Sequence, residues 1–179
     1  LYRAITPDFI ERGVTNFFNN LDDLSVIANE ILQFKFDRAS SDAARFVINS
    51  TVGLLGFFDV SSEMGLSKHN EDFGQTLAQW GFESGPYIVV PFFGPASLRD
   101  LSSLVVDKGV LNPMFYIEDD MTKSGLLTLN YVDFKSRLSS TKELIGAASL
   151  DEYEFIKNAY FEKRAYEIND GNVVDFIGE

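Results

Sequence analysis

Cysteine is absent from this 179-residue chain, so a disulfide framework, a thiolate metal site and a cysteine nucleophile are all excluded. His69 is the only histidine, and no G-x-S-x-G sequence is present, which together argue against a serine hydrolase. The chain also lacks both glycine motifs that bind nucleotide phosphates, G-x-x-x-x-G-K-[ST] and G-x-G-x-x-G. We therefore expect no catalytic residue and no cofactor.

Positive charge is scarce as well. Lys and Arg number 15 against 27 Asp and Glu, which gives a formal net charge of -12. Nucleic-acid binding is disfavoured because phosphates require basic patches, and so is electrostatic adsorption to anionic lipid. Any contact with a membrane would instead need apolar insertion, for which the 17 phenylalanines supply abundant area.

Two uncharged runs, residues 46–58 and 84–98, are 13 and 15 residues long, which is short of the roughly 20 that a transmembrane helix needs. The second run contains Pro86, Pro91 and Pro95, which exclude a long helix there. It predicts an irregular apolar segment, either deep in a core or pressed into a lipid interface.

Helical periodicity dominates the N-terminal third. Apolar residues recur every three or four positions over residues 11–33, with Asn19-Asn20 as a candidate breakpoint. Thr6-Pro7 is expected to start this helix, with Thr6 as N-cap and Pro7 as the first helical residue. A polar break is expected at residues 37–42.

A second helix is expected over residues 45–58, apolar nearly all round, with Gly53 and Gly56 sharing one face. Capping and stop signals place the later elements. The expected features are a helix at 73–80, one at 101–111 capped by Asp100 and ended by Asn112-Pro113, one at 126–138, capping boxes at Ser140–Glu143 and Ser149–Glu152, a last helix to Ile168 stopped by Gly171, and a frayed tail at 172–179.

Strand signals are weak in this sequence. Residues 87–93 resemble a strand, but Pro91 argues against one. No alternating strand ladder, internal repeat or low-complexity linker is visible. The predicted fold is therefore mostly α, in one domain spanning residues 1–179.

Four segments carry a resemblance to a known family. They are GVTNFFNNLDDL (13–24), RFVINSTVGLLGFFDV (45–60), EDFGQTLAQWGFESGPYIVVPFFGPASLRD (71–100) and YEFIKNAYFEKRAYEINDG (153–171). In this order and spacing they resemble the MlaA (VacJ) phospholipid-transport lipoproteins of Gram-negative outer membranes. One segment alone is weak evidence, but four in register are strong evidence, and they are distributed from residue 13 to residue 171.

The resemblance implies a mostly α-helical, ring-like protein around an amphipathic channel, embedded in the periplasmic leaflet of the outer membrane. Its implied function is to remove mislocalised phospholipid from the outer leaflet and so maintain lipid asymmetry. The implied partners are phospholipid, a trimeric outer-membrane porin and a periplasmic MlaC-like lipid carrier. The family's lipid anchor is expected on a cysteine of the native protein that this sequence does not include.

Two groups of candidate site residues follow. Two amides flank two aromatic side chains on the first helix, and Asn is a poor helix-interior residue unless its side chain finds a partner. These four residues are expected to line the lipid path, with a helix kink or cap as the alternative role for the amides. They are Asn16, Phe17, Phe18 and Asn20.

The second group comes from the 71–100 segment and is expected to have structural roles. Its charged members are expected to pair and hold the ends of the apolar run, its glycines to serve turns and close packing, and its Trp and Tyr to be core aromatics. The residues are Glu71, Asp72, Gly74, Trp80, Gly85, Pro86, Tyr87, Pro91, Gly94, Arg99 and Asp100.

His69 stands in the polar run SKHNED, where it forms a candidate metal triplet with Glu71 and Asp72. We interpret this run as a solvated loop and expect no metal. Two other functions remain open: a periplasmic lipid hydrolase, and a helical domain that binds another protein through its Phe-rich face.

Overall fold

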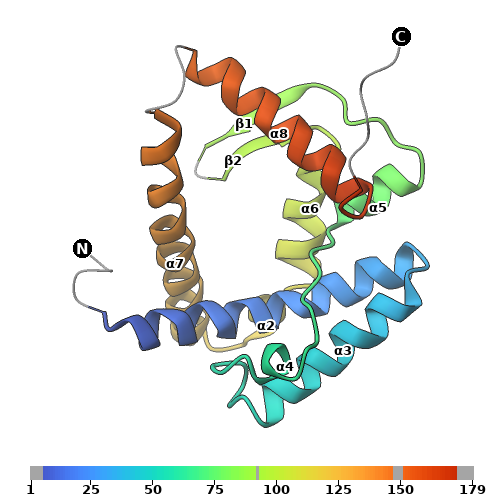
Figure 1. The fold of residues 1–179 in the computed structure, drawn as a ribbon. Helices are drawn as coiled ribbons and strands as arrows, with labels where there is room; N and C mark the ends of the chain where they lie inside the picture. Colours follow the sequence, from blue (N-terminus) through green and yellow to red (C-terminus); the bar gives the residue numbers. More distant parts are fainter. Residues whose placement is uncertain (1–5, 92, 147–150, 173–179) are drawn as a thin grey trace.

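The computed structural model describes residues 6–91, 93–146 and 151–172, and helices dominate it (Figure 1). In chain order the elements are α2 (Asp8–Leu32), α3 (Phe36–Thr51), α4 (Val60–Glu63), α5 (Phe73–Gln79), β1 (Tyr87–Val90), β2 (Gly94–Ser97), α6 (Leu101–Val105), the π-helix η1 (Val106–Val110), the 3-10 helix η2 (Pro113–Tyr116), α7 (Asp120–Gly146) and α8 (Glu152–Ile168).

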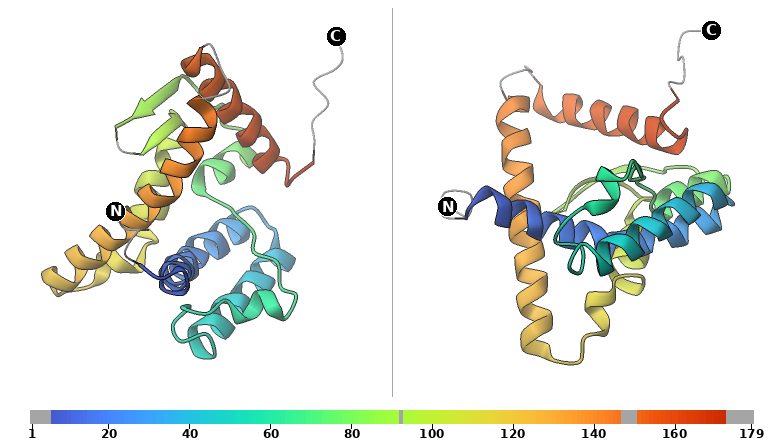
Figure 2. Two further views of the ribbon diagram at one scale, coloured as in Figure 1. Left: turned by 60° about the vertical axis from the view of Figure 1, so that its left-hand side comes forward. Right: turned by 60° about the horizontal axis from the view of Figure 1, so that its bottom comes forward.

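These elements form a ring, as the resemblance implied. In Figure 1, α2 is the lower side, α7 the left side, α8 the upper side, and α5 with α6 the right side. Helix α3 packs against α2 outside the ring, and α4 packs against α3. Figure 2 shows that α7 crosses the N-terminal half of α2 and that the β1–β2 hairpin lies beside α8. The mostly α, ring-like fold is thus confirmed.

Helix α2 is one continuous helix of 25 residues, so the candidate break at Asn19-Asn20 is wrong. The amide of Asn20 donates to Ser50 Oγ at 2.9 Å, and this partner outside the helix removes its reason to interrupt the backbone. The start is displaced by one residue, because Pro7 occupies the N-cap position and Asp8 is the first helical residue.

Helix α3 begins at Phe36, so the polar break expected at residues 37–42 is also wrong. Its polar residues lie inside the helix because they have tertiary partners. Asp42 and Arg45, for example, are buried, and Arg45 Nε lies 3.7 Å from Asp42 Oδ1.

The second helix was expected to reach Phe58, but α3 ends at Thr51. Leu54, Leu55 and Gly56 have positive φ angles of 52°, 59° and 88°, so the chain turns there and no helix face exists for the glycines to share. Close approach does occur at Gly56, where an added Cβ would lie 2.5 Å from Asn20 Cβ.

The apolar segment forms an antiparallel hairpin, in which Tyr87 pairs with Ser97 and Val90 pairs with Gly94. The argument against a strand from Pro91 is therefore wrong. Pro91 follows Val90, the last paired residue, so its missing N–H removes no ladder hydrogen bond.

The predicted boundaries of the later helices agree with the structure in some places and differ in others. Helix α5 agrees with its prediction to within one residue, and the stop at Asn112-Pro113 is confirmed. Helix α8 ends at Ile168, and Gly171 has a φ of 83°, as a stop signal requires. The 101–111 helix is split into α6 and η1.

The start at the Ser140–Glu143 box is wrong, because α7 runs through it to Gly146. Residues three apart also share a face inside a helix, so the pattern does not require a helix start. Ser149 and the tail at 173–179 lie outside the described residues, and the cap of α8 is Asp151, which accepts from Tyr153 N and Glu154 N.

Candidate functional site

One arginine joins three helices, α8, α5 and α6, at the right of the ring. Nη1 and Nη2 of Arg164, on α8, lie 2.7 and 3.0 Å from the carboxylate oxygens of Asp72, the N-cap of α5. Nε and Nη2 lie 3.0 Å from those of Asp100, which precedes α6. The hydroxyl of Tyr160 donates to Asp100 as well. We call Arg164, Asp72, Asp100 and Tyr160 the Arg164 clasp.

The clasp is charged at neutral pH. Burial opposes ionisation of Asp72, but hydrogen bonds from Arg164 outweigh it and hold the pKa of Asp72 below its ordinary value. The pKa of Asp100 is lowered in the same way, against burial, by Tyr160 and Arg164. Burial and the bond to Asp100 raise the pKa of Tyr160 to about 12, so its proton stays in place.

Gly74 provides the space for this clasp. An added Cβ would lie 2.4 Å from Asp100 Oδ1 and 2.9 Å from Arg164 Nη2, so a larger residue would displace the paired groups. The N–H of Gly74 donates to Ser103 Oγ at 2.8 Å, which ties α5 to α6 directly.

The expected pairing of the charged signature residues is only partly direct. Arg99 Nε lies 3.0 Å from Asp100 Oδ1, whereas Asp72 and Asp100 meet through Arg164, which the sequence reasoning did not select. Asp100 makes no capping hydrogen bond to α6, because its carboxylate is engaged in the clasp. The sequence feature that could have identified Arg164 is its place in the fourth family-like segment, residues 153–171.

Glu71 belongs to a different ion-pair group, with Lys35 Nζ at 2.8 Å and Arg38 Nη1 at 3.4 Å. Both cations also pair with Asp170, just after α8. This group ties the α2–α3 turn to the end of α8.

The remaining signature residues support the hairpin and its surroundings. The ring of Tyr87 packs against Tyr153, Tyr160 and Phe161, with centroids 5.7 to 5.9 Å apart. Trp80 is half exposed and donates from Nε1 to Leu32 O at 3.2 Å, so it is no core residue. The others lie at turns or in the hairpin: Gly85 with φ 66°, Pro86 whose carbonyl accepts from Leu98 N, Pro91 in the turn, and Gly94 with φ 101°.

The four residues expected on the lipid path have protein partners. Asn16 donates to Phe57 O at 3.3 Å, and Asn20, which is buried, donates to Ser50. Phe18 is buried with an edge-on contact to Phe17 at 5.2 Å. These contacts give both amides a structural role, and their place on a lipid path stays a prediction.

Asn16 also borders a hollow of about 320 Å³ where the start of α2 meets α7. The hollow is lined by residues with polar or charged side chains, Asp8, Glu11, Arg12, Thr15, Asn16 and Arg137. Thr15 Oγ1 donates to Asp133 Oδ1 at 2.6 Å, which fixes α7 on α2 at the same joint.

A buried network, missed from sequence, joins α2, α5 and η1. Asn29 Nδ2 donates to Asp107 Oδ1 at 2.8 Å and its Oδ1 accepts from Thr76 at 2.8 Å, while Phe73 N donates to Asp107 Oδ2 at 2.9 Å. Burial raises the pKa of Asp107. Asn29 lies in α2, which the sequence predicts from the spacing of its apolar residues. That spacing gives no information on which polar side chains of the helix are buried together.

His69 is half-buried, which corrects its interpretation as a solvated loop residue. Its Nδ1 lies 2.6 Å from Asp42 Oδ2 and 3.8 Å from Glu30 Oε1. Its near neighbours Glu71 and Asp72 bind elsewhere, so the triplet suggested by sequence does not form. Burial and the nearby Asp42 raise the pKa of Glu30 to about 8.

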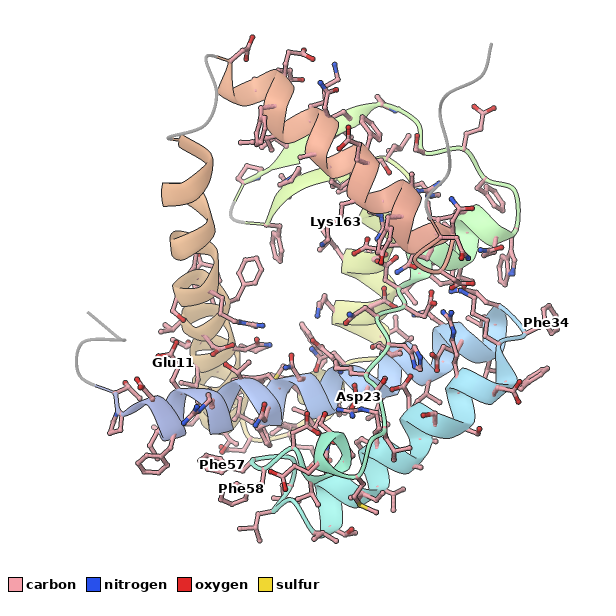
Figure 3. The ribbon with its side chains drawn as sticks, in the orientation of Figure 1. Glu11, Asp23, Phe34, Phe57, Phe58 and Lys163 are labelled. Atoms are coloured by element: carbon pink, nitrogen blue, oxygen red, sulfur yellow. The ribbon has the colours of Figure 1, made fainter. Side chains whose placement is uncertain are left out.

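Burial is inverted relative to an ordinary soluble domain. Among the described residues, buried polar side chains outnumber buried apolar ones, while many large apolar side chains are exposed. Phe34 is 77% exposed and Leu55 69%, and Figure 3 shows Phe34 and Phe58 pointing outward at opposite ends of the α2–α3 pair. None of the helices in the described part of the chain is both long and apolar enough to span a bilayer.

Comparison with known proteins gives consistent matches. The sequence pattern described as MlaA lipoprotein matches residues 1–167. An uncharacterised protein of Rickettsia bellii is 31% identical over 163 residues, 91% of this chain and 64% of that protein. The intermembrane phospholipid transport system lipoprotein MlaA of Escherichia coli is 28% identical over 175 residues, 96% of this chain and 68% of that protein.

A solved structure concerned with the maintenance of bacterial outer membrane lipid asymmetry has a TM-score of 0.77 at 26% identity, covering 94% of this chain and 84% of that one. The chain spans 64 to 65% of the length of the Rickettsia relatives, slightly under two thirds.

Proposed function

The chain belongs to the MlaA lipoprotein family, and from this membership we propose that it is the outer-membrane component of a phospholipid-transport system. It removes mislocalised phospholipid from the outer leaflet and thereby maintains lipid asymmetry. The support from relatives is that those of Haemophilus influenzae and Escherichia coli are named intermembrane phospholipid transport system lipoproteins.

The inverted burial is the observation that carries the proposal. A ring whose polar side chains are buried and whose large apolar side chains are exposed suits a hydrocarbon surrounding better than water. Because the net charge is -12, apolar contact rather than attraction to anionic lipid would provide the attachment. We propose that the helices lie in the periplasmic leaflet, and that a lipid-modified cysteine of the native protein adds an anchor.

A passage through the ring would lower the energetic cost of moving a lipid headgroup. A headgroup dragged through hydrocarbon would lose its hydrogen bonds at a cost of several kcal/mol, whereas a polar-lined passage replaces them. Lys163 of α8 is 74% exposed in its side chain and extends toward the middle of the ring in Figure 3. We propose that the lipid headgroup passes through the ring while its acyl chains remain in the bilayer.

Transport breaks no covalent bond, so we propose that the protein is not an enzyme. A trimeric porin is the proposed partner that holds it in the outer membrane, and an MlaC-like periplasmic carrier is the proposed acceptor of the lipid. Both partners rest on the family membership.

Deletion and re-expression test the function. Without the protein, the amount of phospholipid that added phospholipase cleaves on intact cells should rise, and wild-type chain should restore it. Unchanged phospholipase access in the deletion strain would contradict the transport role. Release of fatty acid from phospholipid vesicles by the purified protein would instead support the hydrolase.

Extraction tests the membrane attachment separately. Detergent should be needed to remove the protein from outer-membrane vesicles, because salt screens attraction between charges but does not weaken apolar contacts. Complete release by high salt would contradict insertion. The variant Leu55→Asp places a charge at an exposed apolar position and should weaken retention, whereas Glu83→Asp is a control at an exposed charged position.

A further inference from the structure

Three side chains from three separate segments converge beside α2. Glu30 comes from α2, Asp42 from α3, and His69 from the loop that follows α4. One nitrogen or oxygen atom of each lies within 4.8 Å of the others. The closest pair is His69 Nδ1 and Asp42 Oδ2 at 2.6 Å, and Glu30 Oε1 is 3.8 Å from the same nitrogen.

Glu30 is the member that protein contacts do not explain. Its side chain is 0% exposed, and neither of its carboxylate oxygens has a hydrogen-bond partner among the described residues. A buried carboxylate without donors is costly, because neither water nor protein replaces its hydration. Its Oε1 is directed at the cluster, so a ligand there would supply what the protein lacks.

The Arg45 guanidinium and the His69 ring lie near different oxygens of Asp42. Arg45 approaches the other oxygen of Asp42, with Nε at 3.7 Å from Oδ1, and its terminal nitrogens bind Asp59, Ser62 and Leu66 O. Asp42 Oδ2 therefore faces His69 rather than Arg45. In their deprotonated forms Glu30 and Asp42 supply two negative charges and His69 supplies a neutral nitrogen, a ligand set that suits a divalent cation.

We propose that Glu30, Asp42 and His69 form a structural site for a divalent transition-metal ion of the Zn²⁺ type. Imidazole nitrogen and carboxylate oxygen are both ordinary zinc ligands at about 2.0–2.2 Å, which places ligand atoms roughly 3.3–3.6 Å apart in a tetrahedron. The present separations bracket that value, so small side-chain rotations complete the site, with water as a fourth ligand. The ion joins α2, α3 and the loop before α5.

A purified-protein experiment tests this assignment. The protein in mild detergent is stripped with EDTA, dialysed, and titrated with ZnCl₂ by calorimetry, with elemental analysis of the dialysed complex. One zinc per chain is expected, together with a rise in Tm of roughly 5–10 °C at a hundredfold excess over Kd. Failure of the wild-type protein to bind zinc would overturn the proposal, and would favour a proton shared by Glu30 and Asp42.

Variants show whether these three residues are the ligands. Glu30→Gln keeps the shape of the side chain, and His69→Ala alters a half-buried loop position, so both proteins are expected to fold. Each should weaken zinc binding by more than the roughly 10–100-fold that loss of an outer-shell partner costs, and should abolish the Tm rise. Glu63→Gln, at an exposed position on α4, is the matched control and should bind like wild type. Wild-type affinity in a folded Glu30→Gln protein would overturn the assignment.

Discussion

The α2–α3 side of the ring and the α7–α8 side are attached in different ways. Helices α2 and α3 share the most extensive contact between any two elements, and the buried side chain of Asn20 adds a hydrogen bond to Ser50. Helix α8 is attached at a few separate points, which are the Arg164 clasp, the ion pairs of Asp170 and the ring of Tyr87. Helix α7 is attached to α2 by the joint between Thr15 and Asp133. Distributed contacts tolerate the loss of one member, whereas a side attached at few points depends on each of them.

Arg164→Met provides the strongest test of this comparison. It leaves Asp72 and Asp100 without their main partner, and loss of one partner of a buried charge pair typically costs about 3–5 kcal/mol. We expect faster hydrogen exchange over α8, with exchange in α2 and α3 nearly unchanged.

Lys163→Met is the matched control for that variant. Lys163 is the neighbouring cation on α8, and its Nζ forms an exposed ion pair with Glu167 Oε1 at 3.2 Å. It should leave stability within about 0.5 kcal/mol. Equal acceleration of exchange in α3 and α8 for Arg164→Met would refute the difference between the two sides.

Acid should loosen the attachment of α8. The pKa values of Asp72 and Asp100 are lowered in the folded protein, so their contribution is present above about pH 4, the value in the unfolded chain, and is lost as pH falls through the folded pKa. The maximum slope is about 1.4 kcal/mol per pH unit for each carboxylate. Unfolding followed by denaturant from pH 7 to pH 3 should show a steeper decline in wild type than in Arg164→Met; parallel curves would contradict it.

Gly56→Ala probes the α2–α3 side. Gly56 and Gly65 have similar φ angles, 88° and 84°, so alanine is strained about equally at both. Only at Gly56 does an added Cβ meet another group, at 2.5 Å from Asn20 Cβ, whereas nothing lies within 4 Å at Gly65. Gly56→Ala should therefore lower the free energy of unfolding by about 1–3 kcal/mol more than Gly65→Ala. Equal losses of stability in the two variants would mean that the turn around Gly56 shifts to accommodate the added Cβ without cost.

Asn16→Leu has the smallest expected effect on stability. It removes one bond of 3.3 Å to Phe57 O, worth about 0.5–1.5 kcal/mol, and keeps a good helix former in place. If Asn16 lies on the lipid path, outer-leaflet phospholipid should rise while protein abundance stays normal.

Asn19→Leu is the control for that variant, because the acceptor at position 19 is the backbone carbonyl, which the substitution keeps. Normal phospholipid access in a stable Asn16→Leu protein would leave Asn16 with the role of fixing α2 to the turn after α3.

Local signals in the sequence determined much of the helical pattern. The stop at Asn112-Pro113, the end of α8 before Gly171, and the extent of α5 each depend on residues within one or two turns of each other. Four family-like segments in order also predicted the ring-like helical fold. The lengths of the two uncharged runs, 13 and 15 residues, predicted that neither forms a helix that spans a bilayer.

The tertiary structure alone decided which polar residues meet. Arg164 lies 92 positions from Asp72 and 64 from Asp100, and His69 lies 27 from Asp42. Helix periods and caps act over three or four residues, so they predict no partner at such separations. The same limit explains the errors at Asn20 and at residues 37–42, where side chains that would interrupt an isolated helix are satisfied by groups from another segment.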